Sequence, residues 1–524
     1  MALSAFSDQA DISDLIDFHA RTRPDAEALV FEDARLSWAA FDETVSRIAN
    51  GLIALGIGRN DKVAVLADTS PEYFCTFFGI VRAGACVVPL SGMATADSLR
   101  LMIQDSGAKA LFISQKTKPL IDEIDKGLPT ILDGGRFAFD FTDSRWADYH
   151  GWLAAQSDSN PGTGIDMLDD FNIIYSSGTT GVPKGILHDH RTRVSYWGGR
   201  DQYGFSTETR MILSTPLYSN TTLFALLPTV AWGGTVVLLP RSDTANYLRL
   251  AEAEKATHTI QVPVQYHRLH DFADFDKFDL SSFIWKFSTS APLRPDHKKW
   301  LITDWPGGLT EIYGMTEGGV GCRLDAHDHP DKLHTVGQPI EGAEFRIVDQ
   351  DMNEVPRGET GELIGRSDFM MTGYYNKPEQ TADSRWIDEQ GRVWQRSGDM
   401  GKMDEDGFVI LLDRMKDMII SGGFNVYAAD LEAALQKHPD VHDVAVIGIP
   451  SDDWGETPLG LVVPHQGATA SEDDIRDWAN QQLGKQQRVS AVEFRTSLPR
   501  STIGKLLKRE LREPYWAGRE GRVG

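Results

Sequence analysis

Cysteine is rare in this chain. Among 524 residues only Cys75, Cys86 and Cys322 carry a thiol. They form no CxxC pair and no metal-ligand spacing, which argues against a disulfide framework and against a zinc module. We therefore expect reduced thiols and a cytoplasmic protein.

Basic charge and long apolar runs are also scarce. The chain has 52 Lys and Arg against 76 Asp and Glu, a formal net charge of −24. A nucleic-acid partner would need basic patches, so none is expected. No apolar run is long enough to span a bilayer, and the first residues lack a basic region followed by an apolar stretch. We expect neither a secretory signal nor integral membrane association.

The patterns that are present predict an α/β protein. Apolar spacing predicts helices over 36–55 and 73–83, and buried-strand runs occupy 62–67 and 110–114. Such alternation favours a largely parallel sheet with helices on both faces. Residues 358–412 are rich in turns and suggest antiparallel β structure. After residue 414 the pattern predicts a compact α+β unit of about 110 residues.

The strongest local signal is Tyr175-Ser-Ser-Gly-Thr-Thr-Gly-Val-Pro-Lys-Gly185, which follows a predicted strand over 172–175. Small hydroxyl residues between glycines let backbone N–H groups approach an anion, and Lys184 adds a point charge. The spacing is not that of a Walker A loop, because Pro183 precedes the lysine. The segment predicts a polyphosphate-binding loop.

The same segment resembles the phosphate loop of the adenylate-forming superfamily, which includes acyl-CoA synthetases, luciferases and peptide-synthetase adenylation domains. Five further motifs resemble this family, in the same order along the chain. They are Tyr313-Gly-Met-Thr-Glu317, Gly361-Glu-Leu363 with Gly373-Tyr-Tyr-Asn376, Ser397-Gly-Asp399, Asp413-Arg414-Met-Lys416-Asp417 with Ser421-Gly-Gly423, and Ile503-Gly-Lys505-Leu506.

The resemblance implies an AMP-forming acyl-CoA ligase that takes ATP, Mg²⁺, CoA and a carboxylic acid. It implies an N-terminal adenylation domain over 1–413, made of parallel-sheet α/β subdomains and a β-rich subdomain. A small mobile α+β domain over 414–524 would follow. Attack of a carboxylate on the α-phosphate brings two anions together, so positioning and charge neutralisation should dominate catalysis.

The resemblance also implies roles for particular residues. Thr316 would hydrogen-bond the α-phosphate, Glu317 would ligate Mg²⁺, and Lys505 would bridge the acyl carboxylate and the α-phosphate. Tyr313 would stack on adenine, Asp399 would hold the ribose, and Arg414 would reach the same ribose or the phosphate. The whole expected ATP/AMP-binding set is Ser176, Ser177, Gly178, Thr179, Thr180, Gly181, Lys184, Ser290, Ala291, Pro292, Glu311, Ile312, Tyr313, Gly314, Met315, Thr316, Asp399, Leu411, Arg414 and Lys505.

A domain rotation is implied between the two half-reactions. Lys416 stands where the family has its hinge residue, which absorbs a large φ/ψ change. After rotation, Gly422, Gly423, Phe424 and Trp454 are expected to border the CoA path, where glycine permits close approach.

The acyl pocket is the least specific prediction. Its candidates are Tyr218, Ser219, Asn220, Tyr266, Gly314 and Gly318. Small residues at Gly318 and Gly319 would leave room beyond the motif, and Ser219 and Asn220 could hydrogen-bond a polar acyl group. A medium-sized or functionalised carboxylate is expected.

The chain departs from the family pattern at three positions. Ser219 replaces an aromatic or histidine, Asp189 replaces Ser or Thr before His190, and Glu311 replaces an amide. An acid at Glu311 could still accept from the adenine amino group. His190 could touch the acyl pocket or be structural.

Three alternatives stay open at this stage. The acceptor could be a carrier-protein thiol, the chain could be a non-catalytic nucleotide-binding homologue, or it could be a light-emitting oxygenase on the same fold. An α-amino acid substrate is less expected, because Asn220 and Thr221 stand near the place where an aspartate would pair with the ammonium. A homodimer is the base-rate expectation for oligomeric state.

Overall fold

The computed structural model describes the chain in ten stretches. They are residues 10–124, 127–176, 183–198, 200–241, 243–414, 417–421, 424–451, 454–483, 488–501 and 506–517. The chain forms two compact units, each described by itself below. Unit 1 comprises residues 1–333, 340–344 and 366–395, and unit 2 comprises 334–339, 345–365 and 396–524.

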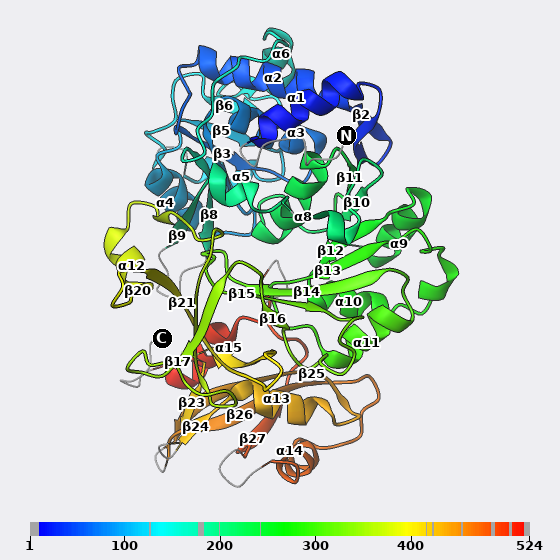
Figure 1. Cartoon of the computed structure of the whole chain (residues 1–524), viewed down its shortest axis with the longest axis vertical. Coiled ribbons are helices and arrows are strands. Elements are labelled where there is room, and N and C mark those ends of the chain that lie inside the picture. The colour runs from blue at the N-terminus through cyan, green and yellow to red at the C-terminus, as the bar shows by residue number, and fades with distance from the viewer. Residues whose placement is uncertain are drawn as a thin grey trace. The chain divides into compact units, whose positions relative to one another are not determined.

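Unit 1 contains two mainly parallel sheets (Figure 1). The first sheet has the order β15 (Gly321–Asp325), β14 (Gly308–Gly314), β13 (Trp285–Ser288), β12 (His258–Gln261), β10 (Arg210–Leu213), β11 (Thr235–Leu238), β1 (Glu27–Phe31) and β2 (Ala34–Ser37). The second has the order β19 (Gly373–Tyr374), β9 (Lys184–Asp189), β8 (Asp170–Ser176), β4 (Cys86–Pro89), β3 (Lys62–Leu66), β5 (Ala110–Ile113), β6 (Arg136–Ala138) and β7 (Ala147–Asp148). Only strands toward the edges pair antiparallel: β1 with β2, β14 with β15, and β9 with β8 and β19.

Helices lie against both faces of the second sheet. The helices of unit 1 are α1 (Ile12–Thr22), α2 (Trp38–Ala54), α3 (Pro71–Arg82), α4 (Ala96–Ser106), α5 (Lys118–Asp122), α6 (Tyr149–Ala154), α7 (His190–Val194), η3 (Arg200–Tyr203), α8 (Asn220–Ala231), α9 (Thr244–Ala253), α10 (Pro263–His270), η4 (Phe275–Lys277), α11 (Pro295–Thr303) and α12 (Pro378–Asp383). Along β3, Val63 and Val65 belong to a core shared with α1, α2, α3 and α8, whereas Ala64 and Leu66 face a core with α4 and α5. This alternation confirms the predicted arrangement.

Local chemistry explains the helix predicted over 36–55. It begins after Ser37, whose hydroxyl accepts from the Ala40 N–H. Its buried face includes Phe41, Val45 and Ile48. It ends before Gly56, which has φ +75° and so suits a left-handed helix terminus.

Unit 2 combines two sheets with helices α13 (Ala428–Gln436), α14 (Glu472–Asn480) and α15 (Lys508–Trp516). The first sheet joins β17 (Glu344–Val348), β18 (Gly361–Arg366), β21 (Val393–Met403) and β22 (Val409–Arg414), while β16 (Gln338–Pro339) lies outside it. In unit 1, β20 (Arg385–Ile387) pairs antiparallel with the first residues of β21. The second sheet is built from β23 (Ile419–Ser421), β24 (Phe424–Val426), β25 (Val441–Ser451), β26 (Gly455–Pro464) and β27 (Ala491–Phe494).

The grouping of segments differs from the expected single boundary. Residues 334–339, 345–365 and 396–413 group with the C-terminal part rather than with the N-terminal one. The reason is that β21 and β22 form one antiparallel hairpin that leads into the C-terminal segment. The division at 413/414 and the mobility of the small domain stay predictions.

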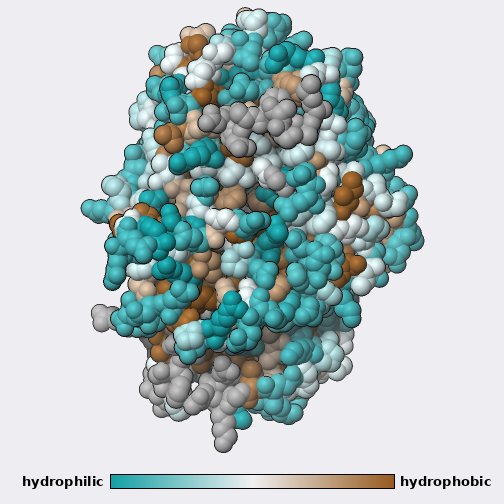
Figure 2. Space-filling model, in the orientation of Figure 1, coloured by the Kyte–Doolittle hydropathy of each residue, from teal (hydrophilic) through white to brown (hydrophobic). Residues whose placement is uncertain are grey.

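The molecular surface fits the composition. The face drawn in Figure 2 is mostly hydrophilic, with scattered apolar residues. Among the described residues, no helix has the length and apolar character needed to cross a bilayer.

Candidate active site

The predicted phosphate loop connects two strands that pair antiparallel. Strand β8 ends at Ser176 and β9 begins at Lys184, and these two residues lie opposite each other in the pairing. Both side chains are half-buried. Ser177, Gly178, Thr179, Thr180 and Gly181 lie outside the described residues. Strand pairing therefore fixes the positions of Ser176 and Lys184, the residues that flank the loop. The phosphate contacts of the loop stay predictions.

A tyrosine joins the loop lysine to the predicted magnesium ligand. Pairing of β19 with β9 brings Tyr374 beside the start of β9. The Lys184 Nζ lies 5.1 Å from the centre of the Tyr374 ring, and the Tyr374 hydroxyl donates to Glu317 Oε1 at 2.8 Å. Burial and the neighbouring Glu317 carboxylate raise the pKa of Tyr374, so the phenol stays a donor at neutral pH. Three motifs that are distant in sequence thus meet at one place.

Backbone bonds hold Glu317 from the other side. Its carbonyl accepts from the Met371 N–H at 2.8 Å. Gly318 has φ +72°, and a Cβ there would lie 1.9 Å from the Phe369 carbonyl oxygen. Glycine is therefore required because the main chain at Phe369 approaches so closely. This corrects the expected reason for Gly318, since the space beside it is filled by backbone rather than left for substrate.

The residues before the Tyr313 motif are anchored in the core. Glu311 on β14 is 2% exposed, forms an ion pair with Lys298 and accepts from the Leu293 N–H at 2.7 Å. Its carboxylate thus ties β14 to the segment that leads into α11, and its adenine contact stays a prediction. Ile312, Tyr313, Met315 and Thr316 are half-buried and Gly314 is exposed. This exposure leaves Tyr313 a partly open ring and argues against a fully buried core tyrosine.

A strained serine lies at the end of β13. Ser290 has φ +79°, a left-handed conformation that costs a residue with a side chain about 1–3 kcal/mol. Its hydroxyl lies 2.6 Å from Thr221 Oγ1 on α8. Ala291 is half-buried and Pro292 exposed. The Thr221 bond connects the predicted adenine segment with the predicted acyl pocket.

The sequence reasoning missed a fully buried arginine beneath the site. The Arg193 guanidinium, 0% exposed, donates to Asn172 Oδ1 and Asn220 Oδ1, each at 2.8 Å. It also lies 3.2 Å from His188 Nδ1, and His188 Nε2 lies 2.8 Å from the Thr316 carbonyl. No motif resemblance covered Arg193, and the preceding residues 190–192 are polar, so the sequence carries no signal of its burial.

The partners determine the state of His188. Arginine can only donate and a carbonyl can only accept, so Nδ1 is the acceptor and Nε2 carries the hydrogen. Burial lowers the pKa of His188 well below its usual value, and the nearby Arg193 charge lowers it further. A neutral His188 therefore transmits the position of Arg193 to the Thr316 main chain.

Replacing Arg193 by methionine should destabilise the protein. The change would leave the acceptors of Asn172, Asn220 and His188 without their donor, at about 1 kcal/mol or more each, or about 3 kcal/mol in total. The midpoint of urea unfolding should fall accordingly. Arg191→Met is the matched control, because the Arg191 side chain is 65% exposed and should shift unfolding by under about 0.5 kcal/mol. Equal midpoints for the two variants would contradict this role.

The acyl-pocket candidates have different environments. Ser219 caps α8 by accepting from the Thr221 N–H, and Tyr218 and Asn220 are half-buried. Tyr266, by contrast, is 0% exposed and its hydroxyl donates to the Phe287 carbonyl at 2.8 Å. We therefore revise Tyr266 to a core residue, because an enclosed and satisfied phenol offers a substrate no surface.

The environment of His190 distinguishes an acyl-pocket contact from a structural role. His190 is 2% exposed and packs edge-on to Phe171, and burial lowers its pKa to about 4. This environment favours the structural interpretation.

Unit 2 brings together the two predicted ribose-binding residues. Asp399 on β21 lies opposite Arg414 on β22, with 3.2 Å between Asp399 Oδ1 and Arg414 Nε. Leu411 is half-buried on β22 and Trp454 is 60% exposed. Phe424 begins β24. Lys416, Gly422, Gly423 and Lys505 lie outside the described residues.

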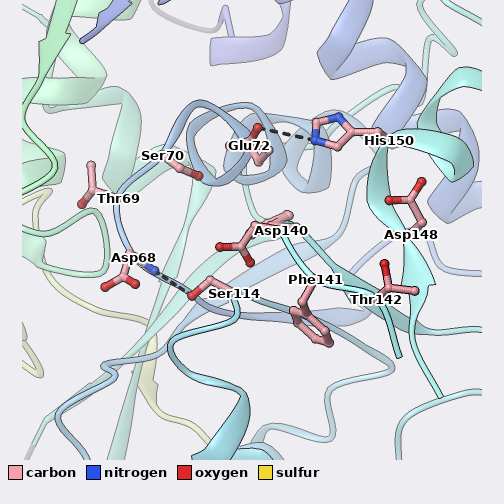
Figure 3. A pocket seen from close by; sticks show the side chains of 11 residues that line it. Asp68, Thr69, Ser70, Glu72, Ser114, Asp140, Phe141, Thr142, Asp148 and His150 are labelled. Atoms are coloured by element: carbon pink, nitrogen blue, oxygen red, sulfur yellow. Dashed lines mark hydrogen bonds and ion pairs between the residues drawn. The ribbon is translucent and has the colours of Figure 1, made fainter. Parts of the chain in front are cut away.

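A cavity of about 480 Å³ is lined by residues outside the adenylation motifs. It is at the carboxyl ends of β3, β5 and β6, and Figure 3 shows its acidic lining. The acidic side chains are Asp68, Glu72, Asp140 and Asp148, and His150 lies among them. His150 Nε2 lies 3.7 Å from Glu72 Oε1. The sequence analysis did not identify this cavity, because its residues come from separate loops with no shared motif.

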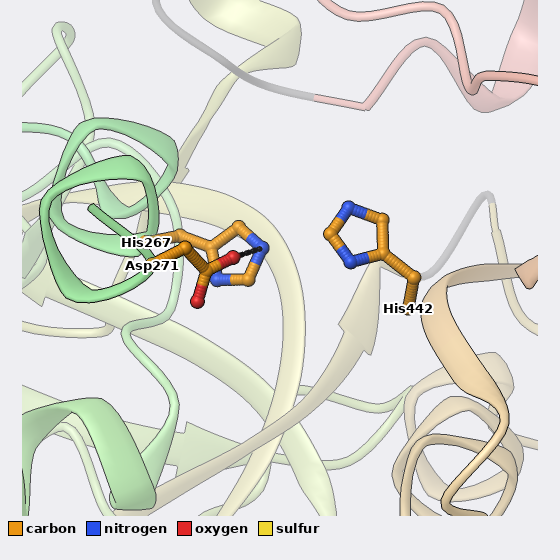
Figure 4. Close-up of side chains that lie close together, drawn as sticks. All are labelled: His267, Asp271 and His442. Atoms are coloured by element: carbon orange, nitrogen blue, oxygen red, sulfur yellow. Dashed lines mark ion pairs between the residues drawn. The ribbon is translucent and has the colours of Figure 1, made fainter. Parts of the chain in front are cut away.

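Helix α10 also carries a polar cluster. Figure 4 shows its His267–Asp271 ion pair, with 3.4 Å between Nε2 and Oδ2. His267 Nδ1 lies 3.4 Å from His297 Nε2 on α11. His442, which Figure 4 also labels, belongs to β25 of unit 2.

Comparison with known proteins agrees with the motifs. Residues 16–375 match the model of the AMP-binding enzyme family, and residues 430–505 match that of the AMP-binding enzyme C-terminal domain. A feruloyl-CoA synthase of Amycolatopsis sp is 31% identical over 95% of this chain and 97% of its own length. The long-chain-fatty-acid–CoA ligase FadD13 of Mycobacterium tuberculosis is 30% identical over 93% and 94%.

Comparison with solved structures indicates the same family. The crystal structure of ATP-bound MatB from Rhodopseudomonas palustris superposes with a TM-score of 0.87 and is 29% identical, covering 97% of this chain and 99% of that one. Fold and site together define an adenylate-forming enzyme. The chain belongs to the AMP-binding enzyme family, and within it to the ATP-dependent acid–CoA ligases, which form an acyl-adenylate and then a CoA thioester.

Proposed function

We propose that this enzyme activates a medium-sized carboxylic acid with polar substituents and transfers the acyl group to CoA. The observation that carries the proposal is the meeting of Lys184, Tyr374 and Glu317 beside the predicted phosphate loop. A cation, a phenol donor and a carboxylate at one loop are what polyphosphate with a divalent cation requires.

The residues support a division of labour in the first half-reaction. Lys184 would hold phosphate oxygens, while Thr316, fixed through His188, would donate to the α-phosphate. The half-buried Glu317 carboxylate suits Mg²⁺, a hard cation that prefers oxygen ligands. When bound, the ion would neutralise phosphate charge. Tyr374 would orient the carboxylate, and Tyr313 would stack on adenine. Lys505 would bridge the two reacting anions.

The second half-reaction is proposed from the family pattern. Rotation at Lys416 would remove Lys505 and bring Gly422, Gly423, Phe424 and Trp454 to the CoA path. The adenylate carbonyl would then be attacked by the CoA thiolate, with AMP as the leaving group. The exposed Trp454 ring is compatible with a surface that meets a ligand.

Two further features belong to the proposal. We place the enzyme in the cytoplasm, since its three cysteines are free and buried, with burial raising the pKa of each thiol. We propose a homodimer, the commonest arrangement among soluble oligomers. Light scattering on the purified protein would measure its mass.

The testing experiment is a turnover assay with ATP, Mg²⁺, CoA and a panel of carboxylic acids, followed by mass spectrometry. AMP, pyrophosphate and an acyl-CoA are the expected products. Acyl-adenylate and pyrophosphate without a thioester would indicate a different acceptor, such as a carrier-protein thiol. A protein that binds ATP but turns over no acid in a broad panel would count against the ligase assignment.

A further inference from the structure

Arg193 and Arg200, two buried arginines of unit 1, differ in their hydrogen-bond partners. Arg193 donates to two amide oxygens and contacts His188, as described above. Arg200, at the start of η3, makes one hydrogen bond to the described residues, from Nε to the Tyr196 carbonyl at 2.6 Å. None of the described carboxylates forms an ion pair with Arg200 or accepts a hydrogen bond from it. Buried cations are ordinarily paired, because desolvation of an unpaired charge is costly.

Aromatic rings surround the Arg200 guanidinium. Its centre lies 4.2 Å from the Phe224 ring and 5.9 Å from the Tyr203 ring. The residue is 8% exposed, and burial lowers its pKa to about 10, so it remains charged at neutral pH. Its Nη atoms form no hydrogen bond with the described residues. The guanidinium is therefore shielded by rings but keeps donors that no described residue uses.

The position of Arg200 relates it to the predicted acyl pocket. Phe224 follows Asn220 by one turn of α8, so the two side chains share one face of the helix. Asn220 is a predicted pocket residue, and the adjacent Thr221 bonds Ser290 of the predicted adenine segment. Arg193 fixes the orientation of Asn220 by donating to its Oδ1, which leaves the amide NH₂ to point away from the guanidinium.

Arg323, which also lies near Tyr203, has the counter-charge that Arg200 lacks among the described residues. Arg323 on β15 also approaches Tyr203, whose hydroxyl lies 3.0 Å from its Nη1. Its charge is already neutralised, with 3.1 Å between Arg323 Nε and Asp325 Oδ2. Of the two guanidinium groups beside Tyr203, Arg200 is thus the one that lacks a counter-charge from the described residues.

We infer that Arg200 is a specificity-determining residue, which pairs with a second anionic group at the far end of the acyl substrate. The inference rests on the proposed ligase function and names its substrate class, namely acids with a distal carboxylate or another distal anion. An anion there would supply the charge-assisted hydrogen bonds that the Nη groups do not make within the protein. The rings of Phe224 and Tyr203 would exclude water and strengthen the pair.

The experiment compares matched acids on the full-length enzyme. Heptanoate is paired with heptanedioate, and 3-phenylpropanoate with its 4-carboxy and 4-hydroxy derivatives. The kcat/KM of acyl-CoA formation is measured for the wild type, Arg200→Met, Arg200→Lys and, as the matched control, Arg323→Met. Calorimetric titration of heptanedioate into each protein reports binding without turnover, and circular dichroism verifies the fold.

The wild type should prefer the dianionic member of each pair. Arg200→Met should lower kcat/KM for the diacids about a hundredfold and change the monoacids only a few fold, since a buried charge pair loses one partner. Arg200→Lys should recover part of the loss, and Arg323→Met should keep the wild-type preference. Calorimetric affinity for heptanedioate should fall in parallel.

Three results would overturn the inference. They are a wild-type preference for the monoacids or the hydroxy acid, an unchanged diacid-to-monoacid ratio in Arg200→Met, and equal heptanedioate affinity in both proteins. In each case AMP release with other acids would still support the ligase function. Diacid binding that depends on Arg200 without any AMP release would instead support the inference and count against the proposed reaction.

Discussion

Replacing Glu317 by alanine should lower the rate of acyl-adenylate formation by about a hundredfold to a thousandfold. The carboxylate accepts from the Tyr374 hydroxyl at 2.8 Å, and the Glu317 main-chain carbonyl accepts from the Met371 N–H. A pre-positioned oxygen ligand needs no reorganisation when the polyphosphate arrives, which is why its loss should be costly. Pyrophosphate release measured at several Mg²⁺ concentrations would test this, and the apparent Mg²⁺ affinity should fall together with the rate.

Two variants separate charge from position at Glu317. Glu317→Gln keeps the shape and an acceptor for Tyr374 but removes the charge, so it should resemble the alanine variant. Tyr374→Phe keeps the charge and removes one hydrogen bond from the phenol to the carboxylate, which should cost about 1.5 kcal/mol, or about tenfold. If Glu317→Gln retained wild-type rates and Mg²⁺ dependence, the assignment of Glu317 as the metal ligand would be wrong.

Replacing Lys505 by alanine should reduce acyl-adenylate formation by about a thousandfold. The prediction rests on the motif Ile503-Gly-Lys505 and on charge, because carboxylate and α-phosphate repel each other as they approach. The loss should be confined to the first half-reaction. When acyl-adenylate is supplied directly, thioester formation should stay within a few fold of the wild-type rate.

The contrast between half-reactions is the decisive readout for Lys505. Arg509→Ala is a suitable control, because Arg509 is an exposed cation in the same segment and should leave both rates unchanged. Equal losses in both half-reactions of a folded Lys505→Ala protein would show that the lysine has another role. Rapid-quench measurement with labelled ATP would distinguish the two steps.

Much of the architecture followed from local patterns. Apolar spacing and capping residues located α2 and α3, and continuous apolar runs located β3 and β5, because these elements depend on side-chain period and local hydrogen bonds. The strand before the phosphate loop was predicted over 172–175 and is observed as β8, two residues longer at its start and one at its end.

The sequence by itself also determined the enzyme class. Six ordered motifs specified the family and located Lys184, Glu317, Asp399 and Arg414. Lys184 could be found because backbone approach to phosphate demands small residues at fixed spacing. Glu317, Asp399 and Arg414 were located by the resemblance of their motifs to the family. Their roles remain predictions, with Lys505 and most of the phosphate loop outside the described residues.

Only the tertiary structure decided what lies between the motifs. Tyr374 meets Glu317 because β19 pairs with β9, a pairing between residues nearly two hundred positions apart that no local pattern encodes. Tyr266 is enclosed by core packing, and Gly318 is required by the approach of Phe369. The buried charges of Arg193 and Arg200 likewise gain meaning only from their neighbours. Electrostatic energy depends on distances in space, and separation along the chain does not set those distances.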